Sequence, residues 1–172
     1  MEWPDKDARE TFEISGFIEA YTCLPGSPTF SIISKGDKPD FVVRESRTGE
    51  EFAVELTAVY LDDRSVPDMH MVDSDSPRDI PYDKEKMERY EGRLISAISN
   101  KIKKACSGYD LSRPLILAIY VNEYIGIYLG PSELDSLVSR NQSFFEAMAP
   151  FHEVVFWSLP NGSAFCVRPG LT

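Results

Sequence analysis

The sequence lacks a long apolar run, is poor in cysteine and histidine, and contains no glycine-rich phosphate-binding loop. Its longest apolar stretch, residues 115–121, is far too short to cross a bilayer, so we expect no membrane association. The first residues lack a basic segment followed by an apolar one. We therefore expect no signal peptide and a cytoplasmic location.

The few cysteine and histidine side chains argue against several site chemistries. Cys23, Cys106 and Cys166 are an odd and widely spaced set, which favours reduced thiols that fill the core over a disulfide framework or a zinc site. His70 and His152 match no metal-ligand spacing, and neither stands in a recognisable arrangement with a serine or cysteine nucleophile.

The charge is strongly acidic but unevenly distributed. A net charge of −10 argues against a general nucleic-acid coat protein, which would be basic. Residues 84–104 nevertheless carry seven Lys or Arg against three Glu, and residues 61–83 carry seven Asp against two Arg. These runs are explained either as a solvated helix face and a solvated loop, or as a phosphate-facing helix and an acidic gate.

The hydrophobic pattern predicts one α/β domain over residues 1–172, because a hydrophobic fraction of 42% in 172 residues is enough for a sizeable core. Between the strand at 51–60 and the strand at 114–121 lies a long helix, which indicates a crossover and a mixed sheet flanked by helices. Residues 61–83 show no periodicity and are predicted to be a long loop. The predicted helices cover residues 5–22, 84–107 and 131–148, and the predicted strands cover 29–34, 40–45, 51–60, 114–121, 154–159 and 164–167.

The strands at 40–45 and 51–60 form a predicted hairpin whose register can be derived. If residues 46–49 are the loop, Glu45 pairs with Glu50 and Asp40 lies opposite Glu55. Arg44 then opposes Glu51, and the apolar residues of both strands share the other face. A shift of one residue would mix apolar and polar side chains on both faces, so the pattern favours this register.

Asp40 and Glu55 are therefore expected to stand side by side. Opposed side chains in an antiparallel pair have Cβ atoms about 4.5–5.5 Å apart, so the two carboxylates raise each other's pKa. A divalent cation such as Mg²⁺ or Mn²⁺ would resolve this repulsion, and could activate water beside a phosphodiester. Alternatively, Asp40 caps its strand and Glu55 points to solvent or to a lysine.

The residues around this pair resemble the core of the PD-(D/E)xK, or restriction-endonuclease-like, superfamily. The resemblance rests on Lys-Pro-Asp-Phe-Val-Val at 38–43, Gly49, and Phe-Ala-Val-Glu-Leu-Thr at 52–57, and it extends over roughly residues 5–122. It implies a restriction-endonuclease-like core, with Asp40 and Glu55 as metal ligands and the carbonyl of Leu56 as a further ligand.

The sequence departs from the family at Thr57, which stands where the family has a catalytic lysine. Threonine carries no positive charge to orient water or to offset developing charge. Some family members take that lysine from the following helix. In the corresponding helix predicted here, at residues 84–107, Lys101 lies about 60° from the centre of the apolar face. Lys101 is the candidate, and the alternative is a boundary lysine whose stem packs along the apolar face while its ammonium reaches solvent. A carboxylate of the first helix sometimes completes such sites, and Glu13 is the candidate here.

The sequence thus predicts a metal-dependent nuclease that uses Mg²⁺ or Mn²⁺, with Asp40, Glu55, Thr57 and Lys101 in the catalytic site and Glu13 as an added ligand. We expect nucleic acid as the partner, DNA rather than RNA, and leave a homodimer open. The missing lysine and the acidic charge support an alternative. In that alternative the chain is a degenerate nuclease-like domain that binds a protein partner as an immunity, inhibitor or assembly module.

Overall fold

The computed structural model describes residues 6–59, 84–121, 129–158 and 163–169. The long loop predicted at 61–83 lies outside these residues. Within them, no helix is both long and apolar enough to span a membrane.

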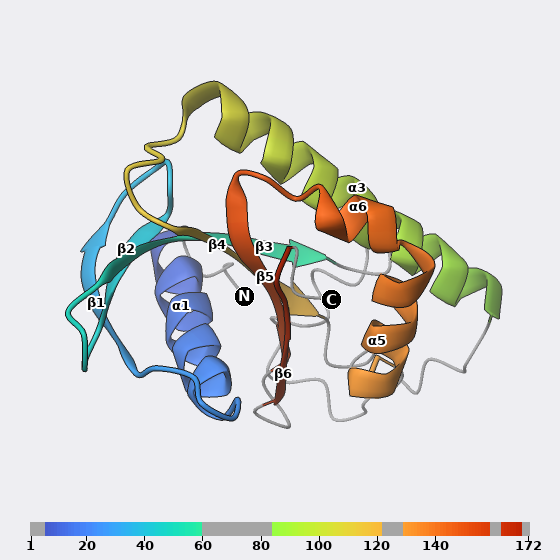
Figure 1. The fold of residues 1–172 in the computed structure, drawn as a ribbon, viewed down its shortest axis with the longest axis horizontal. Coiled ribbons are helices and arrows are strands. Elements are labelled where there is room, and N and C mark those ends of the chain that lie inside the picture. The colour runs from blue at the N-terminus through green and yellow to red at the C-terminus, as the bar shows by residue number, and fades with distance from the viewer. Residues whose placement is uncertain (1–5, 60–83, 122–128, 159–162, 170–172) are drawn as a thin grey trace, which may run out of the picture.

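The described residues form a six-stranded mixed sheet with helices on both faces, as the sequence predicts for an α/β domain (Figure 1). The strands are β1 (Phe30–Lys35), β2 (Phe41–Glu45), β3 (Glu51–Val59), β4 (Leu115–Val121), β5 (Phe151–Ser158) and β6 (Ser163–Val167), and they lie side by side in chain order. β3, β4 and β5 are mutually parallel, and the remaining neighbours are antiparallel. The helices are α1 (Lys6–Thr22), α3 (Lys84–Gly108), α5 (Pro131–Arg140) and α6 (Gln142–Glu146).

Two apolar clusters hold the helices on the two faces of the sheet. α1 packs its buried Ile14 and Phe17 against one face, together with Val54 and Leu56 of β3. On the other face α3, α5 and α6 cover the alternate residues of the same strands, including Ala53. Because side chains alternate along a strand, the continuous apolar run of β4 supplies both layers, and every residue of β4 is buried.

The hairpin of β2 and β3 has the register that the sequence predicts. Phe41 pairs with Val54, and Arg44 pairs with Glu51, with which it also forms an ion pair of 2.7 Å. The ladder closes at the loop, where the Glu45 amide donates to the carbonyl of Glu50 at 2.8 Å. Gly49 adopts a φ of +76° in this turn, a conformation that glycine accepts without steric cost.

The predicted helix at 131–148 is wrong as a single element, because the structure divides it into α5 and α6 at Asn141. Asn141 is non-helical (φ −119°, ψ 30°), and its side-chain amide donates to the carbonyl of Leu137 at 2.9 Å. Short polar side chains compete in this way for backbone partners and end helices.

The strand predicted at 154–159 in fact begins at Phe151. The prediction began too late because the charged Glu153 is buried inside the strand. Glu153 is 2% exposed and accepts hydrogen bonds from Tyr21, Cys166 and Arg168. A sequence pattern treats a glutamate as exposed, and these three partners reverse that expectation. The expectation of core-filling thiols is also wrong for two cysteines: Cys23 and Cys106 are exposed, and all three thiols are free.

Candidate functional site

The candidate site lies where β2 begins beside the second half of β3. The ladder between the two strands ends at the pair Phe41–Val54, whereas β3 continues to Val59 along β4. Residues 55–59 therefore extend beyond the start of β2. Asp40 immediately precedes β2 at this step in the sheet. If the register of the ladder is extended by one residue, Asp40 lies opposite Glu55.

Asp40 binds the backbone of β3 at this step. Its Oδ2 accepts a hydrogen bond of 2.8 Å from the amide of Leu56, beyond the last backbone pair of the ladder. Burial, and then the charge of Glu55, raise the pKa of Asp40 to about 6. The structure thus brings Asp40 and Glu55 together with the mutual repulsion expected of two adjacent carboxylates.

Lys101 of α3 contacts Glu55 directly. Its ammonium donates to Glu55 Oε1 at 2.5 Å and to the carbonyl oxygen of Leu56 at 2.8 Å. Glu55 is 3% exposed, and the Lys101 side chain is 18% exposed, so the ion pair is largely removed from water. Lys103 and Lys104, by contrast, are exposed on the same helix. Of the basic residues at the end of α3, Lys101 is the one that reaches Glu55.

Tyr109, which the sequence analysis missed, is a further partner of Glu55. It follows the end of α3 at Gly108, and its hydroxyl donates to Glu55 Oε1 at 2.5 Å. Both donors therefore bind the same carboxylate oxygen. The other oxygen, Oε2, is buried and has no hydrogen-bond donor among the described residues. Tyr109 lies outside any periodic element, so no sequence pattern could have paired it with Glu55.

A cavity of about 350 Å³ opens beside this cluster. Its volume is within the range of sites that bind small molecules or parts of larger substrates. Glu55 is not among the lining residues, but its hydrogen-bond partner Lys101 is. The lining residues come from α1, from the start of β2, from β3 and from α3: Lys6, Arg9, Glu10, Glu13, Asp40, Leu56, Thr57, Ala58 and Lys101.

Glu13 and Thr57, the remaining predicted site residues, also line the cavity. Glu13 is 8% exposed and pairs with Arg9 at 3.7 Å. Burial raises the pKa of Glu13, while the charge of Arg9 opposes that shift. The roles predicted for Glu13 as a metal ligand and for Thr57 in catalysis remain predictions.

Basic side chains of α1 accompany the acidic ones at the cavity. Lys6 lies 3.4 Å from Glu10 Oε1, and Lys35 of β1 lies 2.8 Å from Glu10 Oε2. Arg9 carries a buried Nε that has no hydrogen-bond acceptor among the described residues. The cavity wall therefore combines carboxylates with cations that can contact an anionic ligand.

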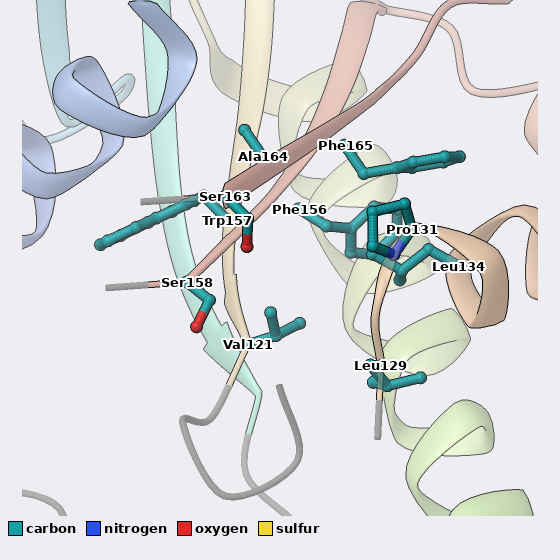
Figure 2. A pocket seen from close by; sticks show the side chains of 10 residues that line it. All are labelled: Val121, Leu129, Pro131, Leu134, Phe156, Trp157, Ser158, Ser163, Ala164 and Phe165. Atoms are coloured by element: carbon teal, nitrogen blue, oxygen red, sulfur yellow. The ribbon is translucent and has the colours of Figure 1, made fainter. Parts of the chain in front are cut away.

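A second hollow, at the carboxyl ends of β4 and β5 and the start of β6, does not compete as a site (Figure 2). It lies beside the start of α5 and has a volume of about 10 Å³, about enough for one water molecule. Phe156, Phe165 and Leu134 contribute to its wall, with Ser158 and Ser163 nearby (Figure 2). A hollow of this size holds no substrate.

Comparisons with known proteins do not assign the chain to a family. No protein-family model matches the chain, and neither a curated protein nor a solved structure matches it significantly. Among the described residues, no group of three or more His, Cys, Asp or Glu side chains converges as a metal site. The acidic centre that the geometry does provide is the pair Asp40 and Glu55 with the carbonyl of Leu56.

Proposed function

We propose that this chain is a metal-dependent nuclease that hydrolyses phosphodiester bonds, with its centre at Asp40 and Glu55. The observation that carries the proposal is the state of Glu55. Its carboxylate is buried, yet Oε2 lacks a donor, and the neighbouring Asp40 has a raised pKa. A buried acceptor without a partner is costly, so Oε2 is a position that a cation or a further donor could fill.

The donor set fits a hard divalent cation. Mg²⁺ is commonly held by one or two carboxylates, with water and substrate phosphate completing its shell. Asp40, Glu55 and the carbonyl oxygen of Leu56 would hold Mg²⁺ or Mn²⁺ here. The ion would supply a more acidic bound water and stabilise charge on the phosphodiester.

The chain's own residues then have separable roles. Lys101 supplies the ammonium that is missing at Thr57, and it can transfer its hydrogen bonds from Leu56 to an incoming phosphate oxygen. Arg9 and Lys6 line the same cavity and can bind the flanking phosphates of the strand. Thr57 contributes a neutral hydroxyl to the wall.

The proposal includes a restriction-endonuclease-like core. It is supported by the antiparallel order β1–β2–β3, followed by α3 and the parallel strand β4, with the acidic pair on β3 and at the start of β2. We expect DNA rather than RNA as the nucleic acid. Lys103 and Lys104 are exposed on α3, which supports a phosphate-facing role for the end of that helix.

The test is cleavage of mixed DNA and RNA substrates in Mg²⁺ or Mn²⁺ by the wild type, Asp40→Asn and Glu55→Gln. Both substitutions preserve size while removing the ligand charge. Glu51→Gln is the matched control, because Glu51 lies on the same strand and pairs with Arg44 and Arg113 away from the cavity. Metal-dependent cleavage that is lost in the two site variants and retained in Glu51→Gln would support the nuclease.

A second function is favoured by one observation. Lys101 already neutralises part of the charge on Glu55 and occupies the carbonyl of Leu56, so the site can persist without a cation. With a net charge of −10, such a domain could act by binding a basic protein partner. Calorimetry separates the two functions: a binding module would show neither Mn²⁺ binding nor cleavage, and Asp40→Asn would leave its partner affinity unchanged.

A further inference from the structure

The two oxygens of the Glu55 carboxylate have unequal surroundings. Oε1 accepts from both the Tyr109 hydroxyl and the Lys101 ammonium, each at 2.5 Å. Oε2 is buried without a donor among the described residues. Both donors thus lie on one side of the carboxylate, and the arrangement leaves Oε2 open to a ligand.

Tyr109 is the more rigid of the two partners. Its amide donates to the carbonyl of Ala105 at 3.3 Å, which holds the residue against the end of α3, and its ring packs on the apolar cluster that α3 covers. The tyrosine side chain has two torsions and a rigid ring, whereas the four-carbon stem of lysine is flexible and can move its ammonium to new partners. The hydroxyl lies 2.5 Å from Glu55 Oε1 and is the donor of that pair, since a carboxylate oxygen accepts.

We propose that Tyr109 is a positioning residue for cation binding: its hydroxyl fixes Glu55 through Oε1 and so presents Oε2 as the ligand oxygen. This inference rests on the proposed metal site. It assigns Lys101 and Tyr109 different tasks, because Lys101 can leave Glu55 when substrate enters while Tyr109 stays. Tyr109 has no contact with substrate or cation in this scheme and acts only through Glu55.

The variant that isolates this task is Tyr109→Phe, which retains the ring and removes the hydroxyl. Groups that orient a metal ligand typically change metal affinity or activity by roughly 10–100-fold when mutated. We therefore expect Mn²⁺ affinity to weaken by roughly 10–100-fold. The measurement is Mn²⁺ titration of the full chain by electron paramagnetic resonance, so that the readout does not depend on cleavage.

Tyr90→Phe is the matched control. Tyr90 lies on α3, is fully buried, and donates to the carbonyl of Val59 at 2.8 Å. Both variants lose the phenol hydrogen bond described above, and we expect both to lower the urea midpoint. Only Tyr109→Phe should weaken Mn²⁺ binding, while Tyr90→Phe should stay within about twofold, since its hydroxyl does not bind Glu55.

The outcomes separate this inference from the nuclease proposal. Wild-type binding and cleavage together with unchanged Mn²⁺ affinity in Tyr109→Phe would overturn the positioning role and leave the nuclease intact. Equal weakening in Tyr90→Phe would also overturn it, because the effect would then be one of general packing. A wild type that binds no Mn²⁺ would overturn both. In the Glu55→Gln background, the effect of Tyr109→Phe on residual binding should disappear.

Discussion

Lys101 donates to Glu55 Oε1 at 2.5 Å, across 46 residues of sequence, and the same ammonium donates to the carbonyl of Leu56 at 2.8 Å. The Leu56 carbonyl oxygen belongs to the donor set proposed for the divalent cation, and Glu55 supplies another ligand of that set through its other oxygen, Oε2. The ammonium therefore occupies one position that a metal ion would use and offsets the charge of a second ligand. Lysine and metal are competitors at this site until substrate phosphate gives Lys101 another partner.

The substitution Lys101→Met tests that competition. It retains an unbranched apolar stem and removes the ammonium, so Mn²⁺ should bind roughly tenfold more tightly, equivalent to about 1.4 kcal/mol. Cleavage should fall roughly 100-fold or more, because the positive charge beside the reacting phosphate is lost. Calorimetric Mn²⁺ titration and single-turnover cleavage measure the two effects.

Lys104→Met is the control for Lys101→Met, since Lys104 is exposed on the same helix. It should leave Mn²⁺ affinity unchanged. Unchanged or weaker Mn²⁺ binding in Lys101→Met would mean that the ammonium does not compete with the ion. Urea denaturation in saturating Mn²⁺ establishes that the variant is folded, because removing one member of a buried pair is destabilising.

The sequence could predict the parts of the site that follow from periodicity. The alternation of apolar residues determined the hairpin register, and helical phase put Lys101 at the edge of the apolar face of α3. It could not predict Tyr109, which follows the end of α3 and has no periodic neighbour. Nor could it predict the burial of Glu153, because three partners distant in sequence determine whether that carboxylate can be buried.

Asp40 should make the metal-free protein less stable as the pH rises. The pKa of Asp40 is about 6 in the folded protein, whereas the pKa of an unperturbed aspartate is 3.8. The folded state therefore binds more protons between these values, and stability falls from about pH 4 to about pH 6. Asp40→Asn, which retains an acceptor for the Leu56 amide, should remove this loss and be roughly 1–2 kcal/mol more stable at pH 7, after discounting for partial exposure.

Urea denaturation of wild type and Asp40→Asn in EDTA, from pH 4 to pH 8, measures this difference. The advantage of the variant should grow between about pH 4 and pH 6 and then level off. Excess Mg²⁺ at pH 7.5 should raise the midpoint of the wild type but not of Asp40→Asn. A difference that does not change with pH would show that Asp40 titrates normally.

The buried Glu153 should depend on Arg168 for stability, independently of any nuclease activity. Arg168 donates to Glu153 Oε2 at 2.9 Å and is 44% exposed, while Glu153 is 2% exposed. Among the described residues, Arg168→Met leaves the buried carboxylate with Tyr21 and Cys166 as donors. It should cost roughly 1–3 kcal/mol, because the exposed arginine is partly screened.

The double variant Glu153→Gln with Arg168→Met should lose less stability than Arg168→Met alone, since no unpaired charge is then buried. Arg47→Met is the control, because Arg47 is 88% exposed in its pair with Glu45. It should change stability by no more than about 0.5 kcal/mol. Equal losses in Arg168→Met and the double variant would show that the charge of Glu153 is not what Arg168 offsets.

The lysine at position 101 should be transferable to position 57. Thr57 lines the same cavity as Lys101 and stands where the resemblance to restriction-endonuclease-like proteins places a lysine. In Lys101→Met, adding Thr57→Lys returns a positive charge to the cavity from β3 instead of from α3. We expect the cleavage rate of the double variant to be at least roughly tenfold higher than that of Lys101→Met, because charge near the reacting phosphate matters more than the element that supplies it.

Ser107→Lys in the same Lys101→Met background adds a charge at an exposed position of α3 and should recover no cleavage. Recovery by both lysines would indicate a general electrostatic effect on nucleic-acid binding, and recovery by neither would show that Thr57 does not occupy the lysine position.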